Sequence, residues 1–182
     1  MKYKQLKYVR LRTGRDHQWF DSFFKGNYIA VGFAMDLDLS NDLFENWREF
    51  NKKYIPEIIK RDPSKSRVAA GLNCGVIWTL SKGIDKDAIV LCQDEDKNYH
   101  PCKVISNYYY EKELGDQFHR RRVEWFDKSI KVGDMSKELV SSLTAQNTLI
   151  DISKYEEELE ELIYGKGETK IVEKNQSRDH TE

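Results

Sequence analysis

A short cationic run could contact an acidic partner. His119 is followed directly by Arg120, Arg121 and Arg122, within the segment GDQFHRRRVEW. The forked guanidinium group matches the geometry of a phosphate, so the run predicts contacts with a nucleic-acid backbone. Alternate side chains of a strand point to opposite faces, so the alternative is that all four cations are simply solvated at a strand edge. The residues alone leave both interpretations open.

Aromatic residues accompany this run. Tyr108–Tyr110 precede it by about ten residues, and aromatic rings beside arginines are the usual means of holding unstacked bases. In a strand Tyr109 points away from its two neighbours, so we expect at least one of the three rings in the core. Trp19 lies in a polar segment without apolar neighbours in sequence, where either a binding or a packing role fits. Trp47 and Trp125 are expected in the core.

The motifs of common enzyme classes are missing from the sequence. It contains no G-x-S-x-G elbow, no phosphate-binding P-loop and no G-x-G-x-x-G. The segments 111–113 and 172–174 resemble a nuclease E-x-K motif without its strand context. Four histidines and three cysteines show no metal-ligand spacing. We therefore expect no catalytic residues, no metal and no cofactor.

Composition limits the classes of partner. The chain has 30 Lys+Arg against 31 Asp+Glu, so nucleic-acid binding must come from a local patch. It has no apolar run of about 18 residues and no apolar N-terminal region, so we expect neither a membrane span nor a signal peptide. Three cysteines without C-x-x-C spacing suit a reducing cytoplasm.

Apolar periodicity and caps predict the elements that position these residues. Asp42 and Glu45 resemble a capping box before a helix with a broad apolar face, and a second helix is expected from Val68 to Lys82, ending at Gly83. The expected strands are 3–12, 27–35, 88–93, 99–110 and 121–127, and the other expected helices are a short one ending at Gly26, one from Asp134 or Ser136 to Leu143, and one from the Ser153–Glu156 box to Gly165.

This order predicts an α+β fold, with a small twisted or closed β-barrel and helices packed outside it. We expect one domain over residues 1–165 and a polar, disordered C-terminal tail over 166–182.

Four segments taken in order resemble one family. They are NYIAVGFAMDLDLS, NCGVIWTLSKGIDKDAIVLCQD, YHPCKVISNYYY and HRRRVEWFDKSI, of which HRRRVEW is the most specific. Over residues 3–165 the chain resembles the EVE-like domains of the PUA-like superfamily, found at the specificity end of modification-dependent, type IV-like restriction systems. The chain departs from that pattern at Lys86-Asp87, where the family usually has Gly-Asp.

The resemblance implies a pocket that accepts a flipped, modified base. By motif position, Trp19 and Phe33 would supply aromatic faces, and Tyr109 is a further candidate for stacking on the base. Asp36 and Asn73 would read the polar edge of the base. We expect Trp19, Phe33, Asp36 and Asn73 to line one concavity whose mouth also sees Arg120 or Arg122.

The function predicted from these residues is binding of DNA that carries a methylated or hydroxymethylated base, as the recognition module of a restriction or defence system. The expected partners are modified DNA and a nuclease or nucleotide-driven motor. Two alternatives are a reader of modified RNA, which would depend on the 2′-hydroxyl, and a small metal-dependent nuclease.

Overall fold

The computed structural model describes residues 3–112 and 115–165. The strands are β1 (Leu6–Leu11), β2 (Tyr28–Val31), β3 (Ile84–Gln93), β4 (Tyr99–Val104), β5 (Tyr109–Tyr110), β6 (His119–Trp125) and β7 (Leu149–Asp151). The helices are α1 (Phe20–Gly26), α2 (Trp47–Arg61), α3 (Arg67–Trp78), α4 (Lys137–Leu143) and α5 (Glu156–Tyr164), with short helical turns at Arg15–His17, Thr79–Gly83, Val132–Asp134 and Ser153–Tyr155. The expected tail lies outside the described residues.

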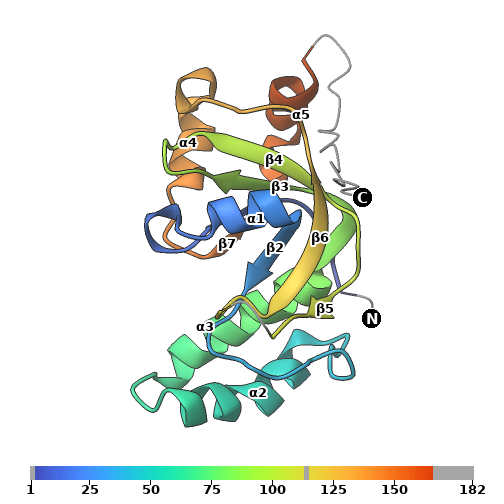
Figure 1. Ribbon diagram of the computed structural model, residues 1–182, viewed down its shortest axis with the longest axis vertical. Helices are drawn as coiled ribbons and strands as arrows, with labels where there is room; N and C mark the ends of the chain where they lie inside the picture. The colour runs from blue at the N-terminus through green and yellow to red at the C-terminus, as the bar shows by residue number, and fades with distance from the viewer. Residues whose placement is uncertain (1–2, 113–114, 166–182) are drawn as a thin grey trace, which may run out of the picture.

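One curled sheet organises the molecule. Its strand order is β2-β6-β4-β3-β1-β7, and β5 pairs with β6 beside this path. β1 and β3 are parallel, and the other pairs are antiparallel. Helices α2 and α3 lie at one end of the sheet, and α4 and α5 lie at the other (Figure 1). The α+β class and the curled sheet are confirmed, but the described strands form an open half-barrel because β2 and β7 remain its edges.

Two apolar cores share this sheet. Along β1, Val9 belongs to the core that packs with α2 and α3, whereas Tyr8 belongs to the core that packs with α4 and α5. Along β3, Val90 likewise belongs to the core beside α2 and α3, and Leu91 belongs to the core beside α4 and α5. Successive side chains of a strand point to opposite faces, so strands covered on both faces need an almost continuous apolar sequence. Trp125 is buried, as expected.

Helix α2 begins later than its predicted cap. Asn46 is the N-cap, and its side chain accepts a hydrogen bond from the backbone N–H of Arg48. Asp42 instead accepts hydrogen bonds from Lys53 Nζ and from the Tyr54 hydroxyl. The expected capping box is therefore wrong, because the acidic side chain is engaged by the middle of the helix. Trp47 is 43% exposed, which contradicts its expected place in the core.

Of the other local predictions, two helix boundaries are confirmed and one capping box is wrong. Gly83 does end the second long helical segment, after a π-helical turn. Ser136 caps α4, its hydroxyl accepting from the N–H of Leu139. The box at Ser153 is not formed, because the Ser153 hydroxyl donates to Asp151 instead. Within the described ranges no helix is long and apolar enough to cross a membrane.

Candidate nucleic-acid interface

A concavity of about 730 Å³ lies where several loops meet. Its walls come from the segment before α1, the end of β2, the C-terminal end of α2, the start of β6 and the loop before β7. Trp19 and Phe33 both line it, so we call it the aromatic cavity. Ligand pockets commonly measure about 300–1,000 Å³, and this cavity falls within that range. The structure thus brings two of the predicted base-binding residues together.

Trp19 is positioned by two glycines from different loops. A Cβ atom placed on Gly14 would lie 2.3 Å from Trp19 Cδ1, and one on Gly115 would lie 3.7 Å from Cη2 at the far end of the indole. Both glycines have a positive φ, which side-chain-bearing residues rarely adopt. The backbone N–H of Trp19 also donates to Thr13 O at 2.8 Å. The indole therefore packs closely against Gly14, where no side chain would fit, while it lines the cavity.

Phe33 sits in a strained turn at the end of β2. Phe33 and Ala34 have φ values of 52° and 57°, and two successive non-glycine residues in this region are unusual. The turn is held by Asp116, whose Oδ1 accepts from Ala34 N–H at 3.0 Å. A Cβ on Gly32 would lie 1.4 Å from the backbone oxygen of Asp116, so this close approach requires glycine. Such strain persists where surrounding contacts impose it, and it is common at binding sites.

Asp36 and Asn73 do not line the aromatic cavity. Asp36 lines a neighbouring depression, and its Oδ1 accepts from Arg61 Nε at 2.7 Å. That hydrogen bond is the main reason why the pKa of Asp36 is below its usual value. Asn73 lies in α3, where its Nδ2 is buried without a hydrogen-bond partner among the described residues. The expectation that all four residues share one concavity is wrong, because α3 packs its residues toward α2 and the core.

Charge around the aromatic cavity is nearly balanced. Its lining residues include four cations, and three aspartates lie among them. Arg61 forms ion pairs with Asp36 and Glu57 at 2.7 Å each. Lys65 Nζ lies 5.9 Å from the centre of the Phe33 ring. In the part of the chain that the structure describes, the remaining lining cations are not in ion pairs; they are Arg12, Arg15 and Lys65.

His119 is fully buried, so the expectation that it contacts phosphate is wrong. Its Nε2 lies 2.7 Å from Met35 O, and since a carbonyl only accepts, Nε2 carries the proton. Nδ1 therefore accepts from the Tyr108 hydroxyl at 2.8 Å, and that hydroxyl accepts from Leu39 N–H at 3.2 Å. Burial lowers the pKa of His119 to about 4. The neutral ring ties β6 to the segment that follows β2.

Arg120 is also buried rather than available to phosphate. Its Nε donates to Gln117 O at 2.8 Å, and its guanidinium carbon lies 3.9 Å from the centre of the Tyr28 ring. In the β2–β6 ladder Tyr28 pairs with Arg122. Arg120 pairs with Ala30, which lies two positions further along β2. Nη2 of Arg120 is buried and has no partner among the described residues. The expected phosphate contact is therefore wrong here too.

Arg121 also does not contact phosphate as expected, because its guanidinium binds backbone carbonyl groups inside the protein. Its Nε donates to Ser106 O at 2.7 Å, and its Nη1 donates to Leu80 O and Ile84 O at 3.1 and 3.0 Å. Burial lowers the pKa of this guanidinium to about 10. The physical reason for all three corrections is that other segments cover these side chains on both faces of β6, whereas Arg122 of the same strand stays exposed.

Arg122 and Tyr109 form the exposed remainder of the predicted site. Arg122 is exposed, and its guanidinium carbon lies 5.0 Å from the centre of the half-buried Tyr109 ring. Neither residue lines the aromatic cavity. Burial raises the pKa of Tyr109 above its usual value, although Arg122 and Arg120 oppose the shift. The two side chains form a separate surface feature on β5 and β6.

The sequence did not single out the cations of the cavity. Arg12 directly follows β1, Arg15 lies in the turn before α1, and Lys65 follows α2. Each lies among other charged and polar residues, so its charge does not stand out in the sequence. Gln117, which is nearly buried and lines the cavity, was also missed. Glycines on either side of Trp19, at positions 14 and 26, were the available signal that the chain turns tightly there. Within residues 3–112 and 115–165 no group of three metal-ligating side chains occurs.

Fold and cavity together define an α+β protein with a curled open sheet and an aromatic cavity between its loops. A family described as a domain of unknown function (DUF8426) matches residues 8–153, and the chain belongs to that family. Neither the search of curated proteins nor the search of solved structures found a match. The likeness to EVE-like domains stays a prediction.

Proposed function

We propose that the protein binds DNA carrying a methylated or hydroxymethylated base, and that the flipped base enters the aromatic cavity. The observation that carries this proposal is that Trp19 and Phe33, from separate loops, line one cavity together with cations that form no ion pair with the described residues. Every base has a π-face, and stacking on an aromatic side chain contributes about 1–3 kcal/mol. In this proposal the fold is a PUA-like, EVE-like domain that recognises the base for a restriction system.

The phosphate contacts in this proposal differ from those predicted by the arginine run. Arg12, Arg15 and Lys65 line the cavity and are the cations available to the strand that carries the flipped base. Three aspartates line the same cavity, so the net local charge is small. Because log K depends on salt through the number of neutralised phosphates, we expect a shallow salt slope of about −1 to −3. Affinity then depends mainly on the base.

Discrimination of the modified base requires both an apolar and a polar contact. A methyl group adds apolar surface whose burial contributes about 0.8 kcal/mol. Gln117 lines the cavity and has an amide that both donates and accepts, so in this proposal it reads the edge of the base. A nuclease or a nucleotide-driven motor acting in trans would convert recognition into cleavage.

The test compares duplexes that differ in one base. Fluorescence anisotropy would measure binding to a duplex with a central 5-methylcytosine or 5-hydroxymethylcytosine, and to the plain duplex. We expect Trp19→Ala to weaken binding to the modified duplex by about 1–3 kcal/mol. The matched control is Trp47→Ala, because Trp47 is exposed on α2 and does not line the cavity.

Folding of each variant is checked by thermal unfolding, and Phe33→Ala provides a second route to the same loss. Equal losses for Trp19→Ala and Trp47→Ala, or no preference of the wild type for any modified duplex, would refute the proposal. Stronger binding to the matched RNA would instead assign the cavity to modified RNA, since the 2′-hydroxyl is what distinguishes the two.

A further inference from the structure

A second cavity, of about 370 Å³, adjoins the aromatic cavity. Thr144 and Ala145 line the second cavity, whereas Gln146 and Thr148 of the same loop line the first. Arg12 lines both, and its Nη1 donates to Gln146 O at 3.0 Å. One loop and one arginine therefore form a wall common to the two cavities.

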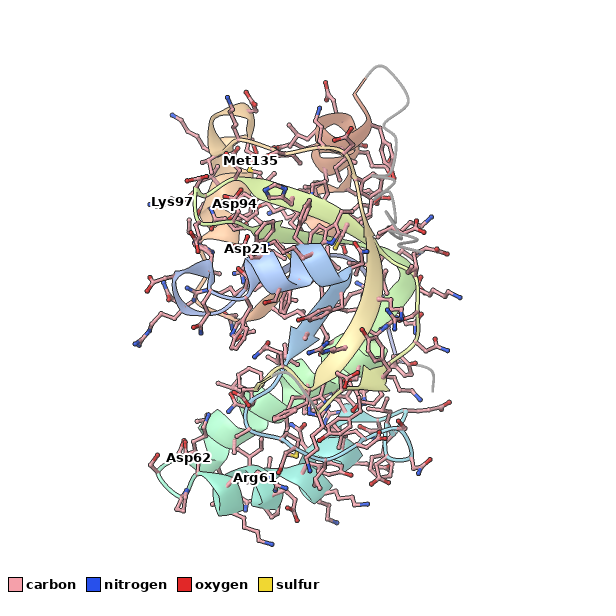
Figure 2. The ribbon with its side chains drawn as sticks, in the orientation of Figure 1. Asp21, Arg61, Asp62, Asp94, Lys97 and Met135 are labelled. Atoms are coloured by element: carbon pink, nitrogen blue, oxygen red, sulfur yellow. The ribbon has the colours of Figure 1, made fainter. Side chains whose placement is uncertain are left out.

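The charges of the second cavity all have one sign. Among the described residues, its lining includes the cations Arg10, Arg12 and Lys97 together with His17, and no aspartate or glutamate. We call it the basic cavity. Lys97 lies in the turn between β3 and β4, near Asp94 (Figure 2). The Asp94 carboxylate is already engaged, since its Oδ2 lies 2.7 Å from His100 Nε2. In the described residues the three Arg and Lys side chains of this cavity are in no ion pair.

The buried Arg10 side chain forms the bottom of the basic cavity. It is 2% exposed, and its two terminal nitrogens donate to the backbone oxygens of Ala145 and Asn147 at 2.7 Å each. Its Nε is buried and has no partner among the described residues. Burial is the main reason why the pKa of Arg10 is lowered to about 10; Tyr99 opposes this shift, and the neighbouring charge of Arg12 supports it. A desolvated cation whose partners among the described residues are backbone carbonyls retains a strong attraction for an anion.

The surroundings of these cations strengthen that attraction. One side of the cavity is apolar and consists of Leu11, Val140 and Leu143. Electrostatic attraction between the cations and an anion is stronger beside such a surface, because water is excluded from it. Two of the lining side chains extend from strained backbone, because His17 has a φ of 56° and Lys97 a φ of 65°. Strain of this kind concentrates at ligand sites.

We propose that the basic cavity binds a phosphate group, with Lys97, His17 and Arg12 contacting its oxygens above the buried Arg10 guanidinium. Phosphate presents several oxygens to forked and single donors at once, which suits this set of side chains. Two sources share this chemistry. One is the backbone of the strand whose base enters the aromatic cavity, which rests on the proposed function, and the other is a free phosphate or mononucleotide.

The first arm of the test uses inorganic phosphate and needs no nucleic acid. Amide chemical shifts in a ¹⁵N-labelled sample would be followed during a phosphate titration at constant ionic strength. We expect saturable shifts at Lys97, Thr144 and Ala145, with affinity about tenfold weaker in Lys97→Gln. Lys131→Gln is the control, because this lysine is exposed and lines neither cavity.

His17→Asn gives a second variant, since asparagine tolerates the left-handed backbone found there. Unsaturable shifts in the wild type, or the same affinity in Lys97→Gln and the control, would overturn the phosphate site. Because this arm contains no base, its result is independent of whether the aromatic cavity binds one.

The second arm assigns the source of the phosphate. If the strand backbone occupies the basic cavity, Lys97→Gln should weaken binding of the modified duplex and make the salt slope shallower by about one. If Lys97→Gln loses phosphate but binds the duplex as the wild type does, the site serves a free phosphate or mononucleotide. Either result supports the phosphate site, whereas loss of duplex binding without loss of phosphate binding would contradict it.

Discussion

The buried His119 predicts a specific sensitivity to acid. Its ring is neutral because burial lowers its pKa to about 4, against 6.5 for an exposed histidine. Well above pH 6.5 neither the folded nor the unfolded chain is protonated at this position, so the full stability is present. Between pH 6.5 and 4 the unfolded chain binds more protons, so stability falls as the pH falls through this window.

The magnitude follows from the two pKa values. Linkage gives a loss of about 2 kcal/mol at pH 5 and about 2.5 kcal/mol at pH 4.5. The structural reason is that a proton on Nδ1 would displace the hydrogen bond donated by the Tyr108 hydroxyl. The affected contacts join β6 to Met35, which follows the strained turn at Phe33. Acid should therefore loosen one wall of the aromatic cavity.

The assay is urea unfolding of the wild type and of His119→Gln at pH 7.5, 5 and 4.5. The variant has no titrating group at this position, so we expect the wild type to lose about 2 kcal/mol more than the variant between pH 7.5 and 5. Ring ¹⁵N shifts of the folded wild type would show directly which nitrogen is protonated. A ring that titrates near pH 6.5 in the folded protein, or parallel pH profiles for the two proteins, would refute this reasoning.

Two further predictions concern stability. Gly32→Ala should lower the free energy of unfolding by about 1–3 kcal/mol, because its Cβ would overlap the backbone of Asp116. Thermal unfolding measures this change. Gly75→Ala, which has open space around its Cβ, is the control and should show no loss of stability. Arg121→Leu should cost at least about 2 kcal/mol in urea unfolding because buried carbonyl groups lose their donor, whereas the exposed Arg122→Leu should change stability by less than about 0.5 kcal/mol. Similar values for the two arginine variants would contradict the internal role of Arg121.

Local patterns in the sequence determined most of the elements. The apolar periodicity after Asn46 produces α2, and the β-branched run ending in Cys92 produces β3. Ser136 caps α4 because a short polar side chain before a helix satisfies a free N–H within its own turn. These features depend on neighbours along the chain, so they can be inferred without knowing the tertiary fold. The placement of Trp19 beside a cavity also agreed with its isolation among polar residues.

Tertiary structure decided which charges face the solvent. A run of four basic residues is typical of a surface, yet His119, Arg120 and Arg121 are buried because other segments cover both faces of β6 at these positions. Their partners are backbone carbonyls and rings from distant segments, and no local pattern encodes those distances. The cations that do line the cavities, such as Arg12 and Lys97, come from segments far apart in the sequence and meet only because the sheet curls. Secondary structure follows from short-range propensity and periodicity, whereas the composition of a site depends on long-range packing.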